Sequence, residues 1–171
     1  MGGSVMDSKI FNDLEALKIA ITIEERGEKF YRRSAEKVDD EFVKALLIKL
    51  AEDENDHRDT FHKLYNEFLA QKDQFNDDYL YDQEVSAYFN AIADSLIFPN
   101  DEEQARMIEG ITGIDDVIKI GIQAEKDSIL LYTQMVISSN LPEAKDAFRR
   151  LLREEKKHLI DLQRIASSIS S

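Results

Sequence analysis

Carboxylate and imidazole side chains recur in this chain at a constant offset of 101 residues, in the pairs Glu24 and Glu125, Glu54 and Glu155, and His57 and His158. In each half, the second Glu and the His form a Glu-x-x-His motif. Residues three apart on a helix lie on the same face. Each half therefore offers one carboxylate from one helix, and a carboxylate with an imidazole from the next helix. Four-helix bundles that bind two iron or two manganese ions use this set of ligands.

The same offset preserves apolar and aromatic positions around these residues. Leu50, for example, returns as Leu151. A tyrosine lies two helical turns after the first Glu of each half, at Tyr31 and at Tyr132. We therefore interpret the two halves of the chain as one helical hairpin used twice.

Apolar residues at spacings of three and four predict two long helices in each half. We expect the first hairpin over about 10–70 and the second over about 113–169. The Asp39-Asp40 pair is typical of the turn and N-cap between two helices. Thr112 is expected to cap the third helix, and Pro142 is expected to open the fourth, because proline suits the first turn of a helix.

A segment of about 70–112 separates the hairpins and has no counterpart in either of them. Two hairpins whose first helices face each other across the core need such a long crossover. Within it, Glu84–Leu96 predicts a fifth, shorter helix, and the acidic stretch Asp73–Asp82 predicts an exposed connection or an interaction surface. The expected fold is thus all-α, a four-helix bundle built from two repeated hairpins with a long, partly helical crossover. It forms one domain over 10–171, after an N-terminal extension (1–9) typical of an expression remnant.

All six repeated residues lie in the apolar phase of their helices and therefore point toward the core. Burying an unpaired carboxylate is costly, so these groups need a compensating cation or must take up protons. Two divalent metal ions would balance the four carboxylates while both imidazoles remain neutral. Asp53 lies outside this phase. Other acidic residues and the third histidine are expected at or near the surface, namely Glu25, Glu28, Glu52, Glu154 and His62.

Composition limits the classes of function that remain. The chain has 22 basic and 35 acidic residues and a net charge of -13, which argues against binding nucleic acids or anionic membranes. It has no cysteine, which excludes disulfides, zinc-thiolate sites, iron-sulfur clusters and a catalytic thiol. It also shows no leader and no apolar run of membrane-spanning length, so we expect a cytoplasmic protein without a membrane partner.

The chain resembles the rubrerythrin branch of the ferritin-like superfamily in the segments that carry these residues, namely Ile23–Tyr31, Leu50–His57, Ala124–Glu125 with Tyr132, and Leu152–His158. The resemblance covers about residues 10–169. It implies a ferritin-like bundle with a non-haem di-iron centre, in which manganese or zinc can replace iron. It also implies that each histidine completes one iron, that Glu54 and Glu155 bridge the two metals, and that Glu24 and Glu125 are terminal ligands.

Two departures from rubrerythrins bear on the expected chemistry. Rubrerythrins usually carry a rubredoxin-type domain with four cysteines that supplies electrons, and this chain has no cysteine. An external donor such as a rubredoxin-like protein is therefore the expected partner, together with peroxide or dioxygen as oxidant. Rubrerythrins also place an extra glutamate three residues after the third-helix ligand, where this chain has Ser128. The ligand set is thus closer to that of bacterioferritin-type sites.

The resemblance implies that the chain reduces hydrogen peroxide to water as a di-iron peroxidase. Two other functions remain open, ferroxidase chemistry that feeds iron storage or delivery, and a metal-free helical scaffold. Tyr31 and Tyr132 are either plain core aromatics or hydrogen-bond donors to the ligand carboxylates that steer protons during catalysis. We expect the chain to form a homodimer or a larger homo-oligomer.

Overall fold

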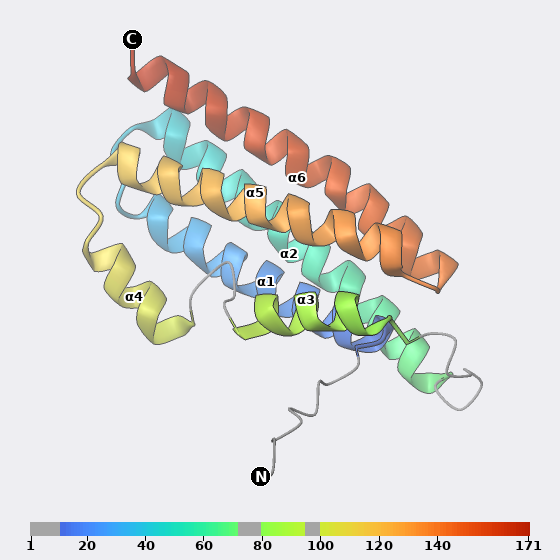
Figure 1. The fold of residues 1–171 in the computed structure, drawn as a ribbon. Helices are drawn as coiled ribbons and strands as arrows, with labels where there is room; N and C mark the ends of the chain where they lie inside the picture. Colours follow the sequence, from blue (N-terminus) through green and yellow to red (C-terminus); the bar gives the residue numbers. More distant parts are fainter. Residues whose placement is uncertain (1–10, 72–79, 95–99) are drawn as a thin grey trace.

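The computed structural model describes residues 11–71, 80–94 and 100–171. Figure 1 shows two long helical hairpins joined by a crossover that carries two short helices, and this confirms the predicted all-α bundle. Helix α1 packs along α2, and α5 packs along α6, while α2 faces α6 and α1 faces α5. The helices are α1 (Asp13–Ala35), α2 (Glu41–Ala70), α3 (Gln83–Asp94), α4 (Asp101–Glu109), α5 (Ile114–Ser138) and α6 (Pro142–Ile169).

Three of the four long helices, α1, α2 and α6, begin where a short polar side chain or proline favours a start. The side chain of Asp40 caps α2 by accepting the backbone N–H of Val43 at 2.9 Å, as predicted. Pro142 occupies the first turn of α6, also as predicted. The predicted cap of α5 was wrong, because Gly113 is the N-cap residue and makes no side-chain cap. Thr112 instead donates its N–H and hydroxyl to Asp116, at 3.1 and 3.0 Å.

The crossover contains one helix that was predicted and one that was not. Helix α3 corresponds to the predicted Glu84–Leu96 helix, and residues 95 and 96 lie outside the described part of the chain. Helix α4 was not predicted. It rests on α1 through polar contacts, because Gln104 is buried, donates to the Arg26 carbonyl at 3.0 Å and accepts from Arg33 at 2.9 Å. Ile108 is the other buried residue of α4, so this helix has no wide apolar stripe.

The predicted exposed connection at Asp73–Asp82 is wrong for Tyr81, and residues 72–79 lie outside the described part of the chain. Tyr81 is buried, and its hydroxyl donates to Asp13 at 2.8 Å. Asp13 also accepts from the Ser139 hydroxyl at 2.6 Å and the Asn140 N–H at 3.3 Å. This fully buried carboxylate therefore ties the start of α1 to the crossover and to the α5–α6 turn.

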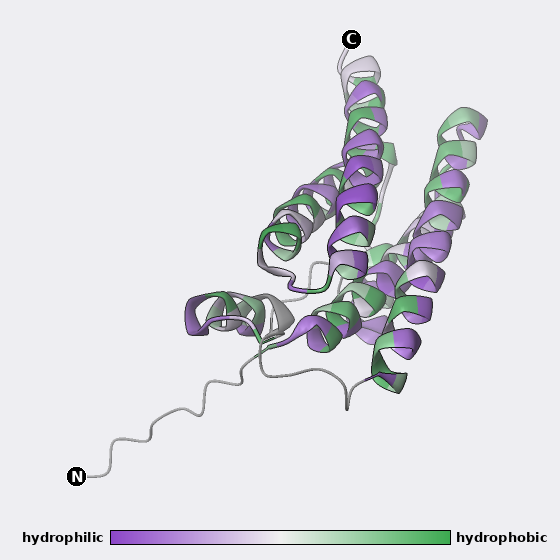
Figure 2. Cartoon of the chain, turned by 90° about the vertical axis from the view of Figure 1, so that its right-hand side faces the viewer, coloured by the Kyte–Doolittle hydropathy of each residue, from purple (hydrophilic) through white to green (hydrophobic). Residues whose placement is uncertain are grey.

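The four long helices bury their apolar faces against one another. Figure 2 shows hydrophobic and hydrophilic residues on different sides of these helices. Each fully buried leucine or phenylalanine contributes about 1.5–3 kcal/mol by leaving water. Ile169, the last residue of α6, lies outside this core and is 39% exposed. No described helix combines the length and apolar character that a membrane span needs. The largest core side chains include Tyr31, Tyr132, Phe30, Phe61 and Phe148.

Candidate metal centre

The structure brings all six repeated residues together in the middle of the bundle, although they come from four helices. All six are buried, with exposed fractions of 3% or less. Their ligand atoms form two overlapping groups, and within each group the atoms lie within 4.8 Å of one another. The groups share two carboxylates, so each of these lies between two potential metal positions. The groups are Glu24, Glu54, His57 and Glu155, and then Glu54, Glu125, Glu155 and His158.

The two imidazoles direct the same nitrogen toward the carboxylates. His57 Nδ1 lies 2.9 Å from Glu155 Oε1 and 3.2 Å from Glu24 Oε2. His158 Nδ1 lies 3.2 Å from Glu54 Oε1 and 3.5 Å from Glu125 Oε1. The two rings are nearly parallel, with centroids 5.7 Å apart. Each histidine therefore contacts the bridging-position glutamate of the opposite hairpin, and the centre is symmetric about the interface between the hairpins.

Two carboxylates on the outer side of the centre contact the other nitrogen of each ring. His57 Nε2 lies 2.6 Å from Glu154 Oε2, and His158 Nε2 lies 3.1 Å from Asp53 Oδ2. Because a carboxylate can only accept, each Nε2 carries a proton, and Nδ1, which faces the inner carboxylates, is the nitrogen that would bind a metal in exchange for its own proton. The two outer carboxylates are partly exposed, at 31% for Asp53 and 39% for Glu154.

Sequence reasoning missed these outer carboxylates. Asp53 was set aside because it lies outside the apolar phase, and Glu154 was wrongly expected to be only a solvated surface group. Yet the two are counterparts under the same 101-residue offset, each directly before the Glu of a Glu-x-x-His motif. That repeated acidic residue was the signal that could have identified them. His62, in contrast, is exposed as predicted.

Each of the two repeated tyrosines hydrogen-bonds to the terminal-position glutamate of the opposite hairpin. Tyr31 donates to Glu125 Oε1 at 2.7 Å, and Tyr132 donates to Glu24 Oε1. Burial and the nearby carboxylates raise the pKa of both phenols well above the usual value, so both remain protonated donors. Of the two readings left open by the sequence, the structure favours hydrogen-bond donors over plain core aromatics.

The charges of the centre are balanced by protons when no metal is bound. Burial alone lowers the pKa of His57, but hydrogen bonds to Glu155 and Glu24 outweigh this and raise it to about 12. Burial also acts to lower the pKa of His158, but its hydrogen bonds, the strongest of them with Asp53, outweigh this and raise the pKa. Both histidines are thus cations in the metal-free chain. The neutral imidazoles expected from the sequence apply only once metal displaces the Nδ1 protons.

The pKa values of three carboxylates of the centre are shifted in opposite directions. Burial and the charge of Glu155 raise the pKa of Glu54 and of Glu125 well above the usual range. Burial also acts to raise the pKa of Glu155, but hydrogen bonds with Glu125 and both histidines hold it well below the usual range. Of these three carboxylates, Glu155 is therefore the one held in its ionised form.

The donor set fits divalent cations. Glu54 Oε1 and His158 Nδ1 lie 3.2 Å apart without forming a hydrogen bond, and Glu125 Oε2 also lacks a hydrogen-bond partner among the described residues. Buried polar atoms that converge without partners are unusual, and a cation would satisfy them. Oxygen and imidazole donors suit iron, manganese and zinc. That the six residues bind metal remains a prediction.

Comparisons with known proteins agree with this geometry. The model of the rubrerythrin family matches residues 15–166 of the chain. A solved structure from Thermotoga maritima, assigned as a ferritin-like diiron-carboxylate protein, superposes with a TM-score of 0.65 at 26% sequence identity. The superposition covers 91% of this chain and 95% of that one. No protein with a curated description matches the sequence significantly.

Proposed function

Because the chain belongs to the rubrerythrin family, we propose that it binds two iron ions in the buried centre and reduces hydrogen peroxide to water. The observation that carries this proposal is the pair of overlapping ligand groups that share Glu54 and Glu155. A shared pair of carboxylates is what two metals a few ångströms apart require. The similarity to a ferritin-like diiron-carboxylate protein supports the same assignment.

The six residues divide naturally between two metals. Glu24 and His57 would hold one ion, Glu125 and His158 would hold the other, and the shared carboxylates would contact both. The bound irons would supply two electrons, one from each ion. Reduction of one peroxide molecule consumes these two electrons and two protons and gives two molecules of water.

The chain's own residues would hold the centre still and manage protons. Tyr31 and Tyr132 hydrogen-bond to the two terminal carboxylates, so their phenols would hold these ligands in place and would donate protons next to them. Ser128 is buried one helical turn after Glu125 and offers a hydroxyl where rubrerythrins place a carboxylate. We infer that no additional anionic ligand draws a metal away from His57, so both histidines stay bound in both redox states.

Electrons would have to come from outside the chain. With no cysteine in the sequence, the chain has no thiolate site of its own for a redox relay. A small one-electron carrier, of which a rubredoxin is one type, would deliver two electrons in successive encounters.

Metal analysis and oxidation kinetics test the proposal together. Protein loaded anaerobically with ferrous iron should contain two ions per chain. In stopped-flow experiments, hydrogen peroxide should oxidise this form faster than dioxygen at equal concentration, and turnover should continue only with added reductant. Faster oxidation by dioxygen would favour the ferroxidase function. A bound-metal content near zero would favour the metal-free scaffold.

The double variant Glu54→Gln/Glu155→Gln is the matched loss-of-metal control, because it removes the two shared carboxylates with little change in shape. It should not retain two ions. The exposed variant Glu52→Gln on the same helix should keep both, since its side chain faces solvent.

A further inference from the structure

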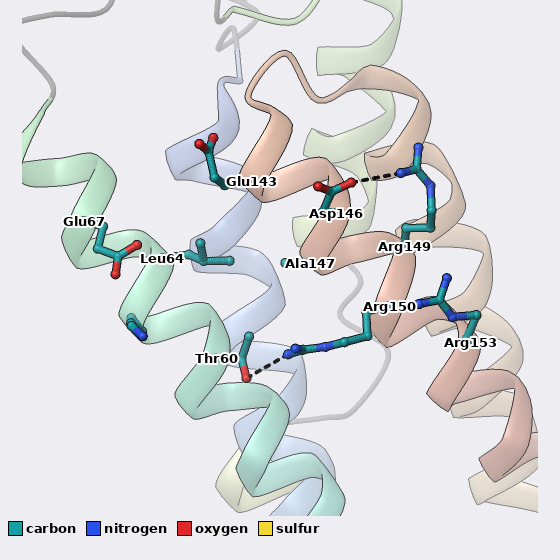
Figure 3. A pocket seen from close by; sticks show the side chains of 10 residues that line it. Thr60, Leu64, Glu67, Glu143, Asp146, Ala147, Arg149, Arg150 and Arg153 are labelled. Atoms are coloured by element: carbon teal, nitrogen blue, oxygen red, sulfur yellow. Dashed lines mark hydrogen bonds and ion pairs between the residues drawn. The ribbon is translucent and has the colours of Figure 1, made fainter.

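A groove of about 660 Å³ runs between α2 and α6 on the outside of the bundle, apart from the metal centre. Figure 3 shows its walls, with α2 on one side and α6 on the other. The hydroxyl of Thr60 on α2 meets Arg150 on α6 across the groove, at 3.4 Å. Leu64 and Ala147 supply an apolar strip in its middle.

Charge is distributed unevenly along the groove. One end carries the acidic residues Glu67 and Glu143. The remainder carries Asp146 and a basic cluster, defined here as Lys63, Arg149, Arg150 and Arg153. In this cluster, Arg149 is paired with Asp146 at 3.0 Å, whereas Lys63 and Arg153 make no hydrogen bond or ion pair with the described residues. These two side chains are exposed cations with no partner of their own.

The basic cluster lies at the end of the groove nearest to the metal centre. Thr60 follows His57 by three residues on α2, which places it about 5 Å further along the helix. On α6, Arg150 precedes Glu154 by one helical turn. Glu154 in turn contacts His57 Nε2 at 2.6 Å and is 39% exposed, so it forms a link from the surface to a ligand of the centre.

We propose that the basic cluster is the docking surface for a small acidic protein that carries one electron. This rests on the function proposed above. Each encounter would oxidise one reduced carrier and deliver its electron through Glu154 and His57 to the metal centre. Two carriers would thus supply the two electrons that one peroxide molecule consumes. Because the whole chain carries a net charge of -13, an acidic partner needs a local basic surface such as this cluster.

The walls of the groove favour an electron carrier over a substrate that enters the centre. Phe61 and Phe148 are the sequence neighbours of Thr60 and Ala147, and both are fully buried. Their rings pack against each other at 5.3 Å and against Tyr132, whose hydroxyl bonds to Glu24. These aromatic side chains separate the groove from the metals. An electron can cross such a packed layer, whereas a molecule cannot.

Binding of a redox-inert partner tests the docking surface without any turnover. The probe is zinc-substituted rubredoxin, an acidic carrier that cannot transfer electrons, titrated calorimetrically into the metal-loaded chain at low salt. The double variant Lys63→Glu/Arg153→Glu should bind it at least about tenfold more weakly than the parent, because reversed charges repel the partner. Added salt should weaken parent binding and shrink this difference.

Lys119→Glu/Arg164→Glu is the matched control. It replaces one exposed lysine and one exposed arginine with the same change in net charge, outside the groove. This variant should bind the probe like the parent. Equal loss of binding in both double variants would show that net charge alone decides, and would overturn the docking surface. A change of assembly state in only the groove variant would also overturn it, by showing that a second copy of the chain occupies the groove.

Electron transfer separates failure of the docking surface from failure of the proposed function. The oxidised metal-loaded chain should accept electrons from reduced rubredoxin more slowly in the groove variant. Oxidation of the reduced chain by peroxide should be unchanged, because the two replaced residues do not touch the centre. Equal reduction by rubredoxin in parent and variant would overturn the docking surface and leave the peroxidase proposal intact. Loss of peroxide reactivity in the parent would overturn the proposed function itself.

Discussion

Glu154 on α6 lies 2.6 Å from His57 on α2, so a carboxylate of one hairpin orients a candidate metal ligand of the other. Asp53 and His158 repeat the same contact at 3.1 Å in the opposite sense. Both contacts place a ring proton on Nε2 and direct Nδ1 toward the inner carboxylates. The two hairpins therefore complete each other's ligands, and neither would form the centre alone.

Removing an outer carboxylate should weaken metal binding, because the ring loses the partner that fixes its orientation and its tautomer. Glu154→Ala and Asp53→Ala should each lower the affinity about 10–100-fold. Competition with a chelator of known affinity measures this. Glu52→Ala, an exposed neighbour of Asp53, is the control and should keep the parent affinity. Parent affinity in both test variants would show that these contacts do not position the histidines.

Removing a tyrosine hydroxyl should destabilise the fold, because it leaves a buried carboxylate oxygen without its donor. We expect Tyr31→Phe and Tyr132→Phe each to lower the free energy of unfolding by about 1–3 kcal/mol in the metal-free chain. Urea titration in the presence of a chelator gives this value. Tyr88→Phe, at a residue 36% exposed, should change it little. If all three variants unfold at the same urea concentration, the phenols do not stabilise Glu125 and Glu24.

Neutralising the two shared carboxylates one at a time should have opposite effects on the metal-free chain at pH 7. The pKa of Glu54 is raised in the folded state, so its contribution to stability is lost as pH rises through that value. Glu54→Gln should therefore stabilise. The pKa of Glu155 is lowered, so its contribution is present above the unfolded-state value. Glu155→Gln should therefore destabilise. Shifts of the same sign in thermal unfolding with chelator would contradict these pKa directions.

The buried carboxyl of Asp13 should make stability depend on pH at a place remote from the metal centre. Burial raises its pKa above the usual value, despite hydrogen bonds from Ser139 and Tyr81 that act to lower it. The ionised form is thus disfavoured by folding, and its cost appears as pH rises through the raised pKa. The stability of Asp13→Asn relative to the parent should therefore increase between pH 4 and pH 7. A difference that stays constant or falls, measured by urea unfolding across this range, would refute the shift.

The sequence by itself determined the helical hairpins and the six residues that meet between them. Helical periodicity is a local property, so spacings of three and four residues are enough to assign each side chain to a face. The constant offset then shows that both halves bury the same kinds of side chain. Because unpaired carboxylates are costly in a core, Glu24 and Glu125 had to find a common environment.

Only the tertiary structure decided which carboxylate meets which histidine, and that Asp53 and Glu154 reach the rings from outside the apolar phase. These contacts join residues from opposite hairpins, and they depend on how α2 and α6 face each other. Helix α4 was missed for a related reason, since it buries only Gln104 and Ile108, and the hydrogen bonds of Gln104 to α1 leave no trace in an apolar pattern. Periodicity describes one helix at a time, whereas a polar contact between helices depends on the position and rotation of both.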